Sequence, residues 1–283
     1  MPNDQPLVSV LIPTFNSRRT VARAIESAQN QTYSNLEIVV QDNASTDGTY
    51  DTVQRHAALD SRLLVERNSS NSGPLRNWQL ALNRCRGDYV KVIWSDDWIE
   101  PDCIDESVRA FDTARDVGVV FTAVVLHSAR FDEPLYRFPS KTVFRRDDYL
   151  RISLSSELLP VSPGCAMIRR RDATFASIDR ASAFFRDAAD NLGAGPDLLF
   201  LLRAVLLHEN VVHIPKFLSH FEASSTNISS AHPTSVCRAY AEARKLVVKQ
   251  IIAPRWPKLA IEIRMRTQLQ RLRVLATRAT SRL

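Results

Sequence analysis

Two adjacent carboxylates, Asp96 and Asp97, are the residues of this sequence best suited to chemistry on a charged ligand. They follow residues 89–94, whose β-branched and aromatic side chains predict a buried strand. Open α/β sheets bind ligands beyond the carboxyl ends of their strands. A divalent cation that carries a diphosphate would relieve the repulsion between the two acids, because hard cations bind carboxylate and phosphate oxygens. The alternative is that one of them caps a helix beginning near Pro101.

A third carboxylate, Asp42, ends a predicted strand at residues 36–40. When ionised it is purely an acceptor, so it can bind a base N–H or a ribose hydroxyl. The alternative is a turn residue that bonds to its own backbone. The chain has only seven glycines and contains neither GxGxxG nor GxxxxGK[ST]. This composition disfavours a dinucleotide-binding Rossmann enzyme and a P-loop NTPase, so any nucleotide is expected to be held without a glycine cradle.

The elements that would position these acids alternate along the first half of the chain. Apolar runs predict strands at residues 7–12, 36–40, 63–65 and 89–94. Helical spacing, clearest at Val21, Ala24, Ile25 and Ala28, predicts helices at 18–31, 49–58 and 74–85. Alternation of this kind is typical of βαβ units, and it predicts an α/β fold around a parallel sheet.

Composition is that of an ordinary soluble enzyme, with 45% hydrophobic and 24% charged residues. The N-terminal residues lack the pattern of a signal peptide, and the longest apolar run is too short to span a bilayer. The cysteines are widely spaced and form no CxxC pair, which indicates reduced thiols rather than disulfides or zinc ligands. They are Cys85, Cys103, Cys165 and Cys237. We therefore expect a cytoplasmic protein.

Four segments together resemble the nucleotide-binding half of family 2 glycosyltransferases: VSVLIPTFN, IVVQDNASTDGT, NSGPLRNWQLAL and GDYVKVIWSDDW. Their order and spacing match over roughly the first 110 residues. The resemblance implies a GT-A fold, in which a Rossmann-like, mostly parallel central sheet is flanked by helices. It also implies use of nucleotide-activated sugars.

The resemblance further implies a set of site residues. Nucleotide-binding positions would be Pro13, Thr14, Phe15, Asn16, Asp42, Asn71, Gly73, Arg76, Asn77, Ser95 and Asp96. A divalent cation, Mn²⁺ or Mg²⁺, would be held by Asp96, Asp97 and His220. Many relatives place one more Asp two positions before the acidic pair, where this chain has Trp94.

A catalytic base is implied at Asp197, which follows a Gly/Pro-containing loop and opens an apolar helix. Taken alone, Asp197 could simply be an N-terminal carboxylate favoured by the helix dipole. Family members have a Glu-Asp pair here whose Asp is the general base, and this chain has Pro196 in place of the Glu. Asp187 and Asp190 are the alternatives, since both lie just upstream.

The second half has a looser pattern. Predicted elements are a strand at 117–126, a loop or hairpin at 130–146, a helix at 150–159, strands at 164–168 and 211–221, a solvated basic turn at 169–171 and a mobile loop at 224–230. We expect one glycosyltransferase domain at residues 1–230, divided into a nucleotide-binding half (1–115) and an acceptor half (116–230). A basic helical C-terminal extension would follow at residues 231–283.

The net charge of +6 lies in this extension, because residues 255–283 carry +7 and the rest of the chain sums to −1. After a helix at 239–252, residues 259–280 predict an amphipathic helix. Its apolar stripe would be Ile261, Met265, Leu269, Leu272, Leu275, Ala276 and Ala279, opposite Arg264, Arg271 and Arg278. Such a helix suits an anionic membrane surface, or a contact with the domain or a second subunit. Nucleic acid is not expected, since Trp256 is the sole aromatic platform there.

These features predict a metal-dependent, inverting glycosyltransferase. It would move a sugar from a nucleotide-diphospho-sugar, with a UDP-sugar favoured, to a hydroxyl of a glycan or lipid-linked acceptor in surface polysaccharide or glycolipid assembly. The enzyme would be cytoplasmic and could bind peripherally to the inner face of the membrane. One alternative is a nucleotidyltransferase, which would need a Gly-rich basic loop where residues 13–16 stand. The other is a non-catalytic nucleotide-sugar binding module.

Overall fold

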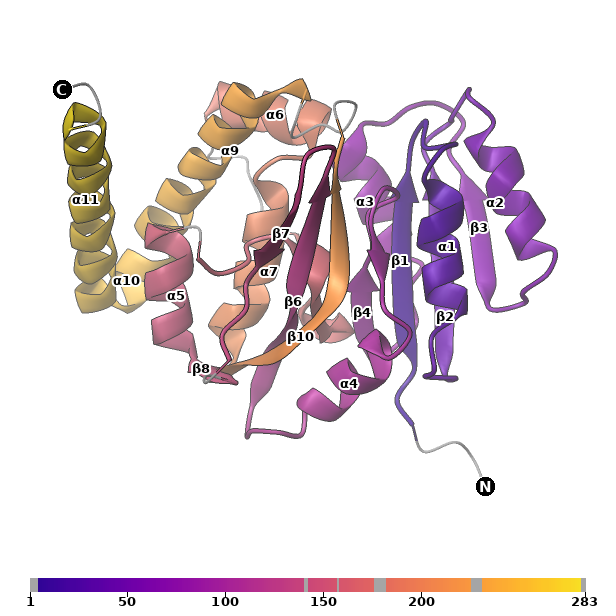
Figure 1. Ribbon diagram of the computed structural model, residues 1–283, viewed down its shortest axis with the longest axis horizontal. Coiled ribbons are helices and arrows are strands. Elements are labelled where there is room, and N and C mark those ends of the chain that lie inside the picture. The colour runs from indigo at the N-terminus through magenta and orange to yellow at the C-terminus, as the bar shows by residue number, and fades with distance from the viewer. Residues whose placement is uncertain (1–4, 140–141, 157, 176–181, 225–230, 281–283) are drawn as a thin grey trace.

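The computed structural model describes residues 5–139, 142–156, 158–175, 182–224 and 231–280, with side chains described as far as residue 270. Of the segment 224–230, predicted as a mobile loop, all but Ser224 lies outside these residues. The strands are β1 (Val8–Thr14), β2 (Leu36–Asp42), β3 (Leu63–Arg67), β4 (Tyr89–Val92), β5 (Trp98–Ile99), β6 (Val117–Ser128), β7 (Asp132–Leu135), β8 (Val143–Arg145), β9 (Ala166–Arg169) and β10 (Asn210–Ala223). They form one sheet in the order β3-β2-β1-β4-β9-β6-β10-β5, with β7 beside β6 and β8 beside β10. Figure 1 shows β7 beside β6 near the centre of the molecule and β3 toward its right-hand side.

The first four strands in that order are all parallel, as the alternation of apolar runs and helical segments predicts. Their connections are α1 (Val21–Gln29), α2 (Thr49–Ala57) and α3 (Pro74–Leu82). The four apolar residues whose spacing predicts the first helix are the four that α1 buries. Since parallel strands end at the same edge, the residues after β1, β2 and β4 meet there.

The second half of the sheet is mixed. β9 is antiparallel to both β4 and β6, β6 is parallel to β10, and β5 is antiparallel to β10. Between and after these strands lie α4 (Cys103–Ala110), α5 (Arg146–Ser155), the 3₁₀ turns η1 (Pro163–Cys165) and η2 (Arg170–Asp172), α6 (Ala183–Leu192) and α7 (Pro196–Leu207). The predicted strands at 117–126, 164–168 and 211–221 are confirmed as β6, β9 and β10.

Some predicted boundaries in this half are wrong. The helix expected at 150–159 is α5, which begins four residues earlier, and the expected loop or hairpin at 130–146 contains β7 and β8. The solvated basic turn predicted at 169–171 is confirmed in part, because Arg170 and Arg171 are exposed in η2, whereas Arg169 ends β9 and is half-buried. Arg169 donates through Nε to the carbonyl of Val117 at 3.1 Å, and Arg170 donates to that of Gly87 at 2.8 Å.

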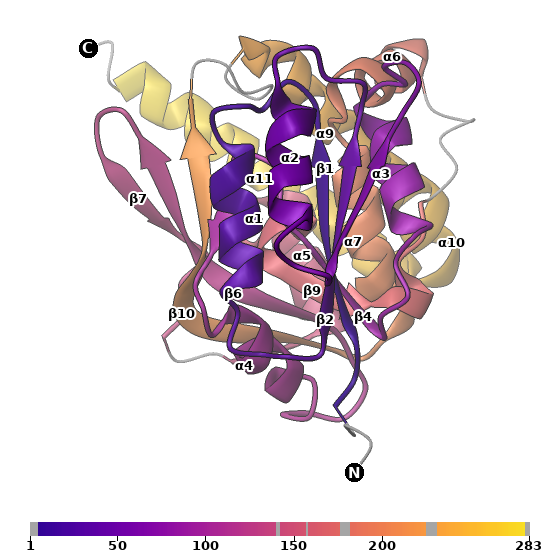
Figure 2. The same cartoon turned by 90° about the vertical axis from the view of Figure 1, so that its right-hand side faces the viewer.

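Two hydrophobic cores lie on opposite faces of the sheet. One packs α1, α2 and α4 against the sheet, and the other packs α3, α5, α6 and α7 (Figure 2). The molecule thus has three layers, helix over sheet over helix. The second core continues into the C-terminal segment, because Val236, Ala239 and Ala243 are buried in it.

The C-terminal segment consists of α9 (Pro233–Leu246), a π-helical stretch η3 (Val247–Ile252), α10 (Ala253–Arg255) and α11 (Pro257–Thr280). Its first helix begins six residues before the predicted start at 239. α11 packs against α5 through Leu259, Ala260 and Ile263. The predicted stripe is a different face, and its first members are exposed: Ile261 by 54%, Met265 by 60% and Leu269 by 56%.

The remaining stripe residues, with Arg271 and Arg278, lie where side chains are not described. A search of the described helices finds none with the length and hydropathy that crossing a bilayer requires.

Candidate active site

The carboxyl ends of β1 and β2 bring Thr14 and Asp42 together, because they are register partners. Asp42 is fully buried; its Oδ2 accepts from the N–H of Ser45 at 3.0 Å and lies 3.3 Å from Nε of Arg67. Its Oδ1 and the Thr14 hydroxyl are buried without a hydrogen-bond partner in the described structure. Leaving such groups unsatisfied costs about 1–3 kcal/mol each. Oδ2 of Asp42 therefore bonds to the local backbone, as the turn interpretation expects, whereas Oδ1 can accept a hydrogen bond from a ligand.

The loop after β1 is fixed to two neighbouring loops. Asn16, at a φ of 49°, accepts through Oδ1 from the N–H of Thr46 at 3.0 Å. Ser17 and Ser95 share a hydrogen bond of 2.7 Å between their hydroxyls, which joins this loop to the start of the acidic pair. Phe15 is 44% exposed at the rim, and Pro13 is half-buried beside it. The structure thus places residues 13–16 and Ser95 around one edge.

An asparagine network holds the loop before α3 against the tip of β2. Asn43 donates to Oδ1 of Asn71 at 2.8 Å, and Asn68 donates to Oδ1 of Asn77 at 3.0 Å. Asn77 is buried and donates in turn to a carbonyl of β2 at 3.0 Å. Two predicted nucleotide-binding residues, Asn71 and Asn77, are thus engaged in hydrogen bonds within the protein. Sequence reasoning missed Asn43 and Asn68, although both stand in or beside the motifs that carry the resemblance.

Backbone packing brings the loop before α3 next to the loop that carries Asp197. A Cβ on Gly73 would lie 2.5 Å from the carbonyl oxygen of Asp190, and one on Gly193 would lie 3.2 Å from Cβ of Pro74. Arg76 is exposed on the first turn of α3. Residues more than a hundred positions apart therefore border the same region.

The acidic pair lies at the carboxyl end of β4, as predicted. Asp97 is 7% exposed, and its Oδ1 accepts from the N–H of Glu222 at 3.1 Å. Arg23 of α1 donates to the backbone carbonyl of Asp96 at 2.7 Å and to the carboxylate of Glu222 at 3.0 Å. These contacts hold the pair against the end of β10 rather than against local backbone, so neither acid acts as a simple helix cap.

Burial raises the pKa of both acids. For Asp97 the pKa is raised well above its usual range, first by burial and then by the charge of Asp96; for Asp96 burial is the main cause. A divalent cation would compensate both effects, and carboxylate oxygens are the ligands that Mg²⁺ and Mn²⁺ prefer. The donor set at Asp96 and Asp97 therefore fits the implied cation.

His220 is engaged elsewhere. Its Nε2 lies 2.8 Å from Oε1 of Glu100, and its Nδ1 lies 2.9 Å from Nε2 of His127, which in turn pairs with Asp132. The imidazole also stacks on Trp98 with ring centroids 5.0 Å apart. The described side chains include no group of three or more His, Cys, Asp or Glu arranged to hold a metal ion. His220 nevertheless lies near the acidic pair, because it is the cross-strand partner of Trp98, the residue after Asp97.

Asp197 stands in the first turn of α7, as predicted. Gly195, at a φ of 96°, and Pro196 turn the chain into the helix, and Oδ1 of Asp197 accepts from the N–H of Gly195 at 3.0 Å. Its Oδ2 accepts from the hydroxyl of Tyr240 in α9. Asp197 is 5% exposed, and burial raises its pKa to about 6, although the bond from Tyr240 opposes that rise.

The alternative acids differ from Asp197. Asp187 is exposed on α6 and accepts from the amide of Asn191 at 2.8 Å, and Asp190 is exposed one turn later. Neither shares the burial of Asp197. Tyr240 is a residue that sequence reasoning missed, because nothing in the spacing of α9 links it to a carboxylate 43 positions earlier.

Aromatic side chains connect the acidic pair to α7. Trp94 contacts Trp78 of α3 edge-on with ring centroids 5.2 Å apart, and Trp78 contacts Phe200 of α7 at 4.7 Å. The indole N–H of Trp94 reaches the hydroxyl of Ser162 at 3.4 Å. Trp94, which stands where many relatives have an Asp, thus packs between elements.

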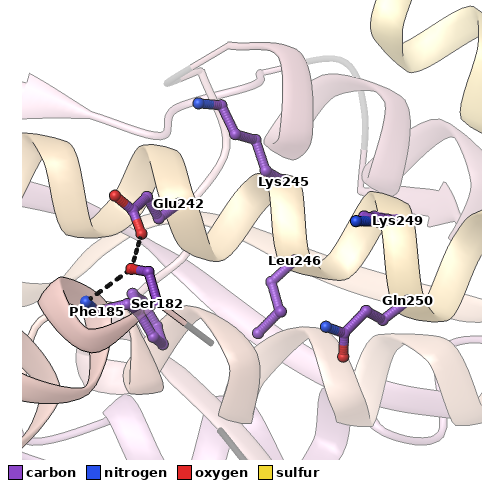
Figure 3. A pocket seen from close by; sticks show the side chains of 7 residues that line it. All are labelled: Ser182, Phe185, Glu242, Lys245, Leu246, Lys249 and Gln250. Atoms are coloured by element: carbon purple, nitrogen blue, oxygen red, sulfur yellow. Dashed lines mark hydrogen bonds between the residues drawn. The ribbon is translucent and has the colours of Figure 1, made fainter. Parts of the chain in front are cut away.

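A pocket of about 260 Å³ lies elsewhere, between α6 and the helices that follow residue 233 (Figure 3). It is lined by Ser182, Phe185, Glu242, Lys245, Leu246, Lys249 and Gln250. None of the predicted site residues is among them.

Comparison with known proteins places this geometry in a family. The profile described as glycosyl transferase family 2 matches residues 9–175, more than half of the chain. Over 138 residues the chain is 33% identical to the putative teichuronic acid biosynthesis glycosyltransferase TuaG of Bacillus subtilis, covering 49% of this chain and 54% of TuaG. The chain spans about half or less of the length of the curated relatives it matches.

Two solved structures show the same fold. The S. aureus TarS 1–349 complex with UDP-GlcNAc superposes with a TM-score of 0.66 at 22% identity, over 87% of this chain and 66% of TarS. The mannosyltransferase PcManGT of Pyrobaculum calidifontis, in complex with GDP-Man and Mn²⁺, gives 0.55 at 17% identity, over 99% of this chain and 81% of that one. The predicted GT-A fold is therefore confirmed. From the profile match and the shared fold, this chain belongs to glycosyl transferase family 2.

Proposed function

We propose that this protein transfers a sugar from a UDP-sugar to an acceptor hydroxyl, with inversion at the anomeric carbon. The observation that carries the proposal is the buried pair Asp96–Asp97 at the carboxyl end of β4, inside the stretch that matches the family. The UDP-GlcNAc complex of TarS supports a UDP-sugar as the class of donor. Family membership favours sugar transfer over the nucleotidyltransferase alternative.

The donor would be held by the edge formed after β1 and β2. Oδ1 of Asp42 accepts a base N–H, and the Thr14 hydroxyl satisfies a further polar atom of the nucleoside, because both are buried without partners in the described structure. Arg76, exposed at the start of α3, pairs with the diphosphate, whose oxygens match a planar guanidinium. Asn71, Gly73 and Asn77 fix the wall behind it.

Asp96 and Asp97 would hold a divalent cation. When bound, it offsets the negative charge that develops on the departing diphosphate. The complex of PcManGT with GDP-Man and Mn²⁺ supports a cation of this kind. Asp97 is fixed by the N–H of Glu222, so its free oxygen has a set direction before any ligand arrives.

Asp197 is the proposed general base. With a pKa of about 6, Asp197 is mostly ionised at neutral pH. Its proton affinity is also higher than that of an ordinary Asp, which favours removal of the proton from an attacking hydroxyl. A base that activates the acceptor on the face opposite the leaving group gives a single displacement, and hence inversion. Its loop borders the wall of the donor pocket at Gly73, which supports this position.

The acceptor is proposed to be a growing glycan on a lipid carrier, as in surface polysaccharide assembly. The name of TuaG, a teichuronic acid biosynthesis glycosyltransferase, supports this class. We further propose that the exposed residues Ile261, Met265 and Leu269, with Arg264 and its basic neighbours, bind the anionic inner face of the membrane.

The acidic pair provides the direct test. Asp97→Asn should lower UDP-GlcNAc hydrolysis at least about 100-fold and abolish the Mn²⁺ dependence of UDP binding in calorimetry, because one carboxylate cannot offset the cation. Asp51→Asn, an exposed acid on α2, is the matched control and should leave both unchanged. UDP binding without any turnover by the wild type would favour the non-catalytic module. Binding that ignores Mn²⁺ in the wild type would contradict the metal assignment.

A further inference from the structure

Helix α9, at the start of the C-terminal segment, brings the side chain of Tyr240 into contact with Asp197, the proposed base. Tyr240 donates its hydroxyl hydrogen bond to Oδ2 of Asp197, across 43 positions of sequence. α9 is held there by Val236, Ala239 and Ala243, which are buried in the same core as α7. The contact is therefore set by the packing of two helices and does not depend on a surface side chain.

The two oxygens of Asp197 are held from two directions. Oδ1 accepts from the N–H of Gly195, at the turn into α7, and Oδ2 accepts from Tyr240. Backbone N–H groups at the start of α7, including that of Leu198, also interact with the carboxylate. Two bonds from different elements also fix the plane of the carboxylate, which a single backbone bond cannot do.

The surroundings of the phenol favour donation to Asp197. Burial and the adjacent carboxylate raise the pKa of Tyr240 well above its usual range, so the phenol keeps its proton at any pH relevant here. Tyr136 and Arg244 are the other titratable side chains that face it. A hydrogen bond donated to a carboxylate stabilises the ionised form, whereas burial of Asp197 stabilises the protonated form.

We propose that Tyr240 is the positioning residue of the base, holding Asp197 ionised and oriented, so that α9 is part of the active site. The inference rests on the proposed function in taking Asp197 as the base. It also goes beyond the stretch that matches the family profile, which ends at residue 175.

The test is Tyr240→Phe, which removes only the hydroxyl. The acidic limb of the pH profile of UDP-GlcNAc hydrolysis with Mn²⁺ should move from near pH 6 to higher pH by about one to two units. The loss of rate should be about threefold for a shift of one unit and about 25-fold for two units at pH 6.5, and small at pH 9. Tyr149→Phe is the matched control, since its buried hydroxyl bonds to the carbonyl of Pro160, and it should not move the limb.

A second measurement does not need turnover. The stability that protonated Asp197 contributes is lost as pH rises through the pKa that Asp197 has in the folded protein. Because loss of the Tyr240 bond raises this pKa, the decline in stability continues to higher pH in the variant. The melting temperature of Tyr240→Phe should therefore fall further below wild type between pH 6 and 8. The offset of Tyr149→Phe should stay constant over this range.

Three outcomes separate the claims. The positioning role would be overturned if Tyr240→Phe changed neither the acidic limb of the pH–rate profile nor the pH dependence of the melting temperature. This would hold even if Asp197→Asn were inactive. A faster Tyr240→Phe enzyme with lower KM for acceptor would overturn it in favour of a tyrosine that blocks the site. Full activity of Asp197→Asn would instead remove the proposed base itself.

Discussion

Asp197 combines burial with a charge that the proposed chemistry requires. Its pKa of about 6, against 3.8 for an ordinary Asp, means that the folded protein favours the protonated form. The stability associated with that proton is complete below about pH 4 and is lost as pH rises to about 6. At neutral pH the ionised base therefore costs the fold about 3 kcal/mol. A residue kept at such a cost is more readily explained by chemistry than by helix capping.

This cost gives a prediction at the residue scale. Asp197→Asn should abolish sugar transfer and yet raise the melting temperature at pH 7.5 by several degrees, because the buried charge is gone. At pH 4, where wild-type Asp197 is protonated, the two proteins should melt together. Thermal denaturation at both pH values measures this. A variant less stable than wild type at pH 7.5 would contradict the argument.

The positions of single site residues were predictable where an acidic side chain directly follows an apolar strand. Asp42, Asp96 and Asp97 follow apolar runs, and parallel strands bring such ends together. Partners set by tertiary packing were not predictable. Tyr240 contacts Asp197 only because α9 packs on α7. His220 forms hydrogen bonds with Glu100 and His127 because β5 pairs with β10.

At the scale of elements, the loop before α3 has little freedom. Gly73 has φ 81° and ψ 159°, a region that only glycine adopts readily. It also touches the backbone of Asp190 at the end of α6. The loop before α3 thus packs closely against α6, the element that precedes Asp197 in the chain.

Gly73→Ala should accordingly lower the free energy of unfolding by at least about 2 kcal/mol and weaken UDP binding about tenfold or more. Gly48→Ala is the matched control. Its φ is also positive, at 93°, but the nearest atom to its new Cβ is the flexible Arg18 side chain at 3.4 Å. Chemical denaturation and calorimetry measure both effects. Equal losses in the two variants would show that the contact with α6 is unimportant.

Elements with a clear hydrophobic period were predicted well, and short or irregular ones were not. β1, α1, β2 and β6 are strongly apolar or strongly periodic. β5 has two residues and forms only because β10 extends far enough to pair with it. The π-helical stretch 247–252 has the same apolar spacing as a continuing α-helix, so no pattern distinguished it.

For the whole molecule, α11 combines a buried contact face with an exposed apolar one. The first turns of α11 pack on α5, where Arg151 also pairs with Glu262 at 2.6 Å, and the following turns expose an apolar stripe. Cationic and apolar side chains together suit the headgroup region of an anionic bilayer. Residues 255–283 carry a net charge of +7, whereas the rest of the chain sums to −1.

Membrane binding through α11 has a direct test. The triple change Ile261→Ser, Met265→Ser and Leu269→Ser should reduce co-sedimentation with vesicles of phosphatidylcholine and phosphatidylglycerol several-fold. Leu59→Ser, which alters an exposed leucine on another part of the surface, is the control and should bind as wild type does. Unchanged co-sedimentation together with loss of a dimer in sedimentation velocity would instead assign the stripe to a second copy.

The order of the strands in the sheet also determines which truncated fragments of this protein should fold. A fragment ending with the family match at residue 175 would lack β10, which lies between β6 and β5 inside the sheet. Such a fragment would leave the long edge of β6 unpaired and would remove α6 and α7 from one apolar face of the sheet, conditions that favour aggregation. A piece intended to fold should therefore extend at least to Ile263, the last residue with a described side chain that is buried in the core.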